Sequence, residues 1–129
     1  MPDDARMKYL RAALVLVGVI FIFGIYTLGI VWPSGWVWHT GQSHYLQMIM
    51  GVYATLGVFL IIASRNPLAN LSLIWFTVWS SVVHAGIMAV QALSMPNQRG
   101  HLVGDVPALL IVAVLLGALT PRGAQARTA

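Results

Sequence analysis

The sequence predicts an all-α membrane protein, an antiparallel bundle of four transmembrane helices with both termini in the cytoplasm. Hydrophobic residues make up 59% of the 129-residue chain and charged residues only 8%, and the mean hydropathy is +0.82. Soluble domains carry about 25% charged residues, so this chain has too few to cover its surface in water. Apolar runs of membrane-spanning length also recur along it, separated by short polar connections.

The first predicted helix covers residues 12–32 and follows a short polar stretch that holds Arg6, Lys8 and Arg11. This 21-residue run is longer than the apolar region of a signal peptide, which has roughly 7–15 residues, and no small-residue cleavage site follows it. Pro33-Ser34-Gly35 ends the helix with turn-forming residues. A Trp-rich loop comes next, as is typical of the membrane–water interface.

The second and third predicted helices cover residues 44–63 and 68–93. Asn66 suits an N-cap and Pro67 a first helical position, so the connection between the two helices is short. The third helix contains no Asp, Glu, Lys or Arg. Its 26 residues extend over roughly 39 Å, against a hydrocarbon core of about 30 Å.

The fourth predicted helix covers residues 105–120 and stops before Pro121, and residues 122–129 form a disordered tail. We therefore predict a single membrane domain over residues 1–129. Small residues at helical spacing predict close helix packing. They are Gly51, Ala54 and Gly57 in the second helix, Ser81, Ala85 and Ala89 in the third, and Ala113 and Gly117 in the fourth.

Basic residues predict the orientation of the chain. Six of the seven Lys and Arg lie in the N-terminal stretch, the connection at Arg65 and the C-terminal tail, whereas the connections on the other side hold only Arg99. The positive-inside rule then places both termini in the cytoplasm. The prediction is a multi-pass protein of the bacterial inner (cytoplasmic) membrane.

His84 is the one ionisable residue well inside an apolar segment. At membrane depth such a residue is a functional-site hypothesis by default. Helical spacing groups polar and sulfur-bearing side chains on one face of each of two helices. These are His44, Gln47 and Met48 on the second helix, and Ser80, His84, Met88 and Gln91 on the third. If the two faces meet, they enclose a polar pocket open to the outer side.

A neutral histidine in hydrocarbon needs hydrogen-bond partners, because an unpaired polar group is costly there. Tyr26, Tyr53 and Ser80 lie at a depth suitable to supply them. His84 is therefore either a structural side chain held by such bonds, or a ligand or proton-carrying group. The predicted ligand-binding residues are His84, His44, Gln47, Gln91, Tyr26 and Tyr53.

Three kinds of bound group fit these residue types. Imidazole and thioether ligands select copper, and the candidate ligands for it are His44, Met48, His84, Met88 and His101. A b-type haem would use His84 and His44 as axial ligands, which requires two histidines at similar depth on facing helices. His44, however, lies nearer the membrane surface than His84. The third kind is a small amphipathic molecule, such as a quinone or a lipid, held between the helices.

The absence of Cys excludes disulfides, thiol redox chemistry and thiolate metal sites. Phosphate-binding loops and the G-x-S-x-G and H-E-x-x-H motifs are absent as well, and we expect no carboxylate deep in the membrane. We therefore predict a non-catalytic protein that contacts the lipid bilayer and not nucleic acid. It is either an accessory or assembly partner, in a larger membrane complex or a homo-oligomer, or a ligand-binding protein. The alternative is a metal- or haem-binding redox component.

The most individual stretches of the chain are GQSHYLQ at residues 41–47 and WSSVVHAG at residues 79–86. In helix count and topology the whole chain resembles the small four-helix inner-membrane proteins of bacteria, including the broad DoxX-like group. The resemblance implies a bacterial membrane protein, and it implies no activity and no functional residues.

The predicted orientation can be tested by labelling. Cysteines introduced at Thr40 and Asn97 should react with a membrane-impermeant thiol reagent added outside the cell, because both sites lie in outer connections. Cysteines at Asn66 and Gln125 should react only after the membrane is permeabilised. The reverse pattern would show that the termini lie outside.

Overall fold

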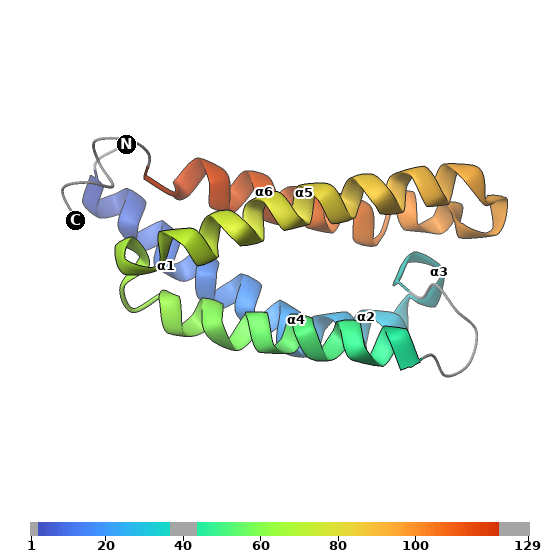
Figure 1. The fold of residues 1–129 in the computed structure, drawn as a ribbon, viewed down its shortest axis with the longest axis horizontal. Helices are drawn as coiled ribbons and strands as arrows, with labels where there is room; N and C mark the ends of the chain where they lie inside the picture. Colours follow the sequence, from blue (N-terminus) through green and yellow to red (C-terminus); the bar gives the residue numbers. More distant parts are fainter. Residues whose placement is uncertain (1–2, 37–43, 122–129) are drawn as a thin grey trace.

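The computed structural model describes residues 3–36 and 44–121, and every regular element in these two ranges is helical (Figure 1). The first range holds α1 (Asp3–Val19), a π-helical turn η1 (Ile20–Gly24), α2 (Ile25–Val31) and the short α3 (Pro33–Trp36). The second holds α4 (His44–Ala63), the 3-10 helix η2 (Pro67–Asn70), α5 (Leu71–Ser94), the 3-10 helix η3 (Pro96–Leu102) and α6 (Asp105–Leu119). The tail predicted at residues 122–129 lies outside the described residues.

Three helical stretches of the described residues are long and apolar enough to cross a membrane: Asp4–Gly24, Pro67–Ser94 and Pro96–Leu119. α4 contains a shorter apolar stretch, Gln47–Ala63. The prediction of an all-helical chain is thus confirmed for the described part of the protein, and the three long stretches indicate a membrane protein.

α1 begins at Asp3, inside the stretch that the sequence shows as polar, and not at residue 12. The reason is a tertiary contact made by Arg6. Its Nε donates to the carbonyl of Leu119 at 3.0 Å, and its Nη2 donates to those of Ala118 at 2.9 Å and Thr120 at 3.1 Å. The last carbonyls of a helix have no partner within the helix, and a cation is favoured at that end. Arg6 therefore caps α6 and ties the start of α1 to it.

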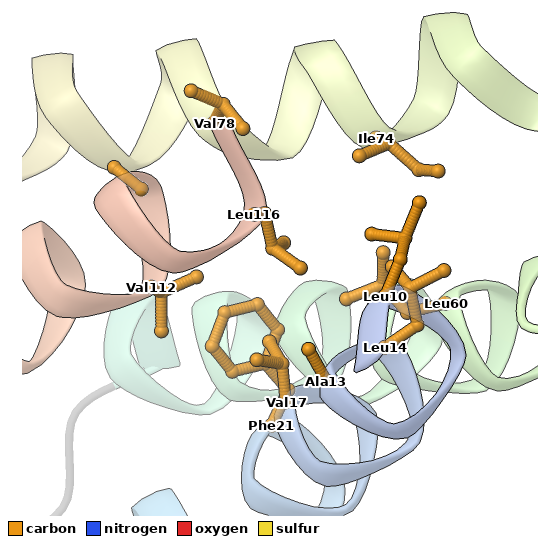
Figure 2. Packing of buried hydrophobic residues seen from close by; sticks show 11 residues of the cluster. Leu10, Ala13, Leu14, Val17, Phe21, Leu60, Ile74, Val78, Val112 and Leu116 are labelled. Carbon is orange, nitrogen blue, oxygen red and sulfur yellow. The ribbon is translucent and has the colours of Figure 1, made fainter. Parts of the chain in front are cut away.

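The main hydrophobic core lies where α1, α4, α5 and α6 converge (Figure 2). It consists of Leu10, Ala13, Leu14, Val17 and Phe21 from α1 and η1, Leu60 from α4, Ile74 and Val78 from α5, and Val112, Ala113 and Leu116 from α6. Figure 1 shows α4 and α5 close together where η2 joins them and farther apart towards α3. α4 and α5 therefore approach each other mainly at the end where η2 joins them.

α1 and α4 touch through their backbones at Gly18 and Gly57. A Cβ atom at Gly18 would lie 2.6 Å from the carbonyl oxygen of Gly57, and one at Gly57 would lie 2.5 Å from that of Gly18. Only glycine permits this approach. The packing role predicted for Gly57 is confirmed. A Cβ at Gly51 would face open space among the described residues, so the packing role predicted for Gly51 stays a prediction.

α5 and α6 also lie against each other along small side chains. Ser81 and Ala85 of α5 are buried, as are Ala113 and Gly117 of α6. Ala85 belongs to a second cluster of buried residues that includes Val106 of α6. The small-residue seam predicted on the third helix is thus used within one chain.

The segment at residues 95–104, predicted as a connection on the outer side, is largely helical. Residues 96–102 form η3, and the stretch Pro96–Leu119 is apolar enough to cross a membrane. Glycines place η3 against α3, since a Cβ at Gly100 would collide with the carbonyl of Ser34, and one at Gly104 with that of Gly35.

The cap made by Arg6 predicts a measurable contribution to stability. Arg6→Ala should lower the free energy of unfolding by about 1–2 kcal/mol, because the last carbonyls of α6 lose both hydrogen bonds and a compensating charge. Lys8→Ala is the matched control, since Lys8 is exposed on the same helix, and should cost less than about 0.5 kcal/mol. Thermal unfolding in detergent micelles measures both. Equal losses would show that Arg6 acts only as a surface charge.

Candidate functional site

His84 of α5 shares a hydrogen bond with Tyr53 of α4, formed between its Nδ1 atom and the phenol oxygen. The two rings are stacked, with centroids 5.6 Å apart and planes inclined by 29°. The structure thus gives His84 one of the three partners that its position in the sequence suggests. The contact spans α4 and α5 at a level where few other residues of these two helices meet.

Phe21 also packs against the ring of Tyr53. Its ring meets that of Tyr53 edge to face, with centroids 5.1 Å apart and planes inclined by 83°. Phe21 is the buried residue of η1, the π-helical turn between α1 and α2. Such turns are rare, and they occur often at functional sites because they re-aim side chains within a continuous helix.

A second polar pair joins η3 to α6. Nδ1 of His101 lies 3.0 Å from both carboxylate oxygens of Asp105, and the exposed fractions of the two residues are 0% and 7%. The N-cap of α6 is Gly104, and no side chain caps it. Asp105 directly precedes Val106 and Pro107, a pattern that suits an N-cap, but in the structure it is the first residue of α6. Its side chain is occupied by His101 one turn earlier.

The two pairs lie in one region of the molecule. Tyr53 packs against the cluster formed by Ala85, Met88, Val106 and Leu109. Two of its members, Ala85 and Val106, directly follow His84 and Asp105 in the sequence. Because η3 is helical, Asp105 lies within a continuous helical stretch of 24 residues that is long and apolar enough to cross a membrane. The expectation that no carboxylate lies deep in the membrane stays a prediction.

The pocket predicted between the second and third helices is not formed as its residues suggest. Gln47 and Gln91 are both exposed. Met48 is 57% exposed on α4, whereas Met88 is 6% exposed and packs against α6. The side chain of His44 lies outside the described residues. The two faces separate because α4 packs on α1 and α5 packs on α6.

The other two predicted partners of His84 do not contact it. Tyr26 is 62% exposed on α2. The hydroxyl of Ser80 donates to the carbonyl of Thr77 in its own helix, at 3.3 Å. Tyr53 alone of the three contacts His84, since spacing along the chain gives depth but not which helix faces which.

The described residues show no group of three or more His, Cys, Asp or Glu side chains that could hold a metal ion. His84 and His101 each have a polar partner already. The copper and haem sites therefore stay predictions. Of the two histidines that both sites share, His84 and His44, the side chain of His44 lies outside the described residues. His101 lies four residues before Asp105, a spacing that makes the two side chains neighbours only if the helix begins early. The helical η3 meets this condition.

Comparison with known proteins gives one family match. Residues 4–128 match a family of unknown function, DUF6632. The chain belongs to this family. The match covers α1 from its second residue and every later described element through α6. It supports neither the resemblance to the DoxX-like group nor a bacterial origin. Searches of curated proteins and of solved structures found no match.

The bond between Tyr53 and His84 can be measured by a double-mutant cycle. Tyr53→Phe and His84→Leu should each lower the free energy of unfolding by about 1–3 kcal/mol, because each leaves a polar group unpaired. The double variant should cost less than the sum, with a coupling of about 0.5–3 kcal/mol. His84→Gln keeps a donor and an acceptor and should cost less than His84→Leu.

Thermal unfolding in detergent micelles gives all four values. Tyr26→Phe is the control, because it removes the same hydroxyl from an exposed ring. Strictly additive losses would show that the Tyr53–His84 bond contributes nothing to the fold.

Proposed function

We propose that this chain is a four-span protein of the bacterial inner membrane, with both termini in the cytoplasm, that binds a small amphipathic molecule without transforming it. Three of the spans are the long apolar stretches. The fourth is α4, whose 20 residues extend over about 30 Å, the thickness of a typical hydrocarbon core. The helices then alternate in direction, as in an antiparallel bundle, and six of seven basic residues fall on the cytoplasmic side.

The observation that carries the binding function is the second ring nitrogen of His84. Its Nδ1 bonds to Tyr53, and among the described residues its Nε2 has no hydrogen-bond partner. A polar group left unpaired in apolar surroundings costs free energy, and such groups are rare in native proteins unless a further partner serves them. A polar group of a bound molecule is that partner.

The apolar part of the ligand would lie against exposed apolar side chains near His84. Ile87 follows His84 by one helical turn on α5, and Ile49 precedes Tyr53 by one turn on α4, so both continue the site towards α3. Both are exposed, and α4 and α5 separate in this direction (Figure 1). An aliphatic or quinone-like body lying between them buries this surface.

Native mass spectrometry of the protein purified from its own membranes tests the proposal. Wild-type protein should carry a stoichiometric amphipathic molecule. His84→Gln should lower its occupancy by roughly two- to tenfold, which is the value of one hydrogen bond. Tyr26→Phe, in which a polar group is removed from an exposed ring, should leave the occupancy unchanged.

Other results would favour other functions. A copper ion or haem lost in folded His84→Gln protein would favour the redox alternative. A large complex that survives His84→Gln, with no small molecule bound to the wild type, would favour an accessory or assembly role. Either result would overturn the ligand-binding proposal.

A further inference from the structure

The bond between Tyr53 and His84 decides which nitrogen of the imidazole carries a proton. It joins the phenol oxygen to Nδ1, and the phenol can either donate its hydrogen to Nδ1 or accept one from it. Among the described residues, His84 is the only hydrogen-bond partner of the Tyr53 hydroxyl. If the phenol accepted, its own hydrogen and Nε2 of His84 would both be left unpaired. If it donates, only Nε2 is left.

The phenol is therefore the donor, because each polar group left unpaired in apolar surroundings costs free energy. A neutral imidazole has a single N–H, and with Nδ1 accepting from Tyr53 this N–H lies on Nε2. A protonated imidazole donates from both nitrogens, so Nε2 is a donor in that state too. The unpaired group that His84 offers to a ligand is thus an N–H donor.

We propose that the molecule held at His84 is a quinone in its oxidised form, and that Tyr53 makes the site selective for it by fixing a proton on Nε2. This inference rests on the proposed ligand-binding function. The N–H of Nε2 donates to one carbonyl oxygen of the quinone. The ring of His84 then has no acceptor nitrogen left for the hydroxyl of a quinol. Tyr53 is a positioning residue, because it acts on the ligand through His84.

The depth of His84 favours a quinone over the ester carbonyl of a bilayer lipid. α5 has 24 residues and extends over about 36 Å, against a hydrocarbon core of about 30 Å. His84 lies ten residues before Ser94 at the end of α5. With α5 centred in the membrane, His84 is roughly 12 Å inside the core. Lipid esters stay near the edge of the core with their headgroups, whereas a quinone has no charged group to hold it there.

The side chains near His84 suit the rest of a quinone. Tyr53 stacks on His84, and Phe21 meets Tyr53 edge to face, so a flat ring finds aromatic neighbours. Ile49 and Ile87, both exposed, offer apolar surface for the chain that the ring carries. His84 is itself half-buried. A molecule that moves within the bilayer can therefore reach its ring.

The test uses the full-length protein in phosphatidylcholine nanodiscs and three probes: a decyl-trimethylbenzoquinone, its quinol kept reduced under argon, and decyl-trimethylbenzene. Native mass spectrometry measures the occupancy of each probe, at equal mole fraction in the bilayer, in wild type, Tyr53→Phe and Tyr26→Phe. Nitrogen-15 NMR of labelled histidine shows which ring nitrogen of His84 is protonated and whether a probe shifts its resonance. The resonances of His84 are those that His84→Gln protein lacks.

In the wild type, Nε2 of His84 should be protonated. The quinone should bind roughly two- to tenfold more tightly than the quinol or the hydrocarbon, which is the value of one hydrogen bond, and should shift the Nε2 resonance. In Tyr53→Phe the proton exchanges between the two nitrogens. The Nε2 resonance should therefore move towards that of an unprotonated nitrogen, and quinone binding should weaken about twofold as the competent fraction falls. Tyr26→Phe should change neither quantity.

The outcomes separate the two proposals. A proton on Nδ1 alone, equal binding of the three probes, or preference for the quinol would overturn the quinone inference. So would the absence of any shift of the His84 resonances. The ligand-binding function is wrong as well only if protein purified from its own membranes carries no small molecule. If Tyr53→Phe does not fold, the protonation of Nε2 and the order of the probes on wild type still decide.

Discussion

The backbone contact between Gly18 and Gly57 is the constraint on which the arrangement of the site depends. Each glycine occupies a position where a Cβ would meet the carbonyl oxygen of the other. Phe21 follows Gly18 by three residues and Tyr53 precedes Gly57 by four, so each aromatic ring lies one turn from the contact. A larger side chain at either glycine would push α1 and α4 apart. It would thereby separate Phe21 from Tyr53 and move Tyr53 relative to His84.

A second set of glycine contacts acts at the other end of the molecule. Gly100 and Gly104 let η3 and the start of α6 lie directly on α3. These contacts make residues 96–102 part of a helical stretch rather than a loop, and they fix Asp105 inside it. Membrane helices gain little from burying apolar surface against one another, and close backbone approach is their main means of association. The polar cluster therefore lies where glycines allow, between two backbone contacts.

The sequence predicts features that depend on composition well, and the contacts between helices poorly. Helical structure, membrane-length stretches and the buried face at Ser81 and Ala85 follow from hydropathy and the spacing of small residues. The early start of α1 does not, because the carbonyls that Arg6 caps lie 112–114 residues away. The facing of α4 towards α5 does not either, since periodicity assigns residues to faces without giving the angle between helices. For the same reason, depth in the membrane gave three candidate partners for His84, and only the packing of the helices selects Tyr53.

Stability does not explain the polar cluster. The hydroxyls of Thr77 and Thr120 donate to carbonyls one turn earlier in their own helices, so they are satisfied wherever the helices lie. Tyr53 with His84, and His101 with Asp105, instead bond from one element to another. Replacing buried polar or charged pairs by apolar residues of similar volume is often neutral or stabilising. A polar cluster is therefore not the general requirement for holding helices together at this level, which supports the binding role proposed for it.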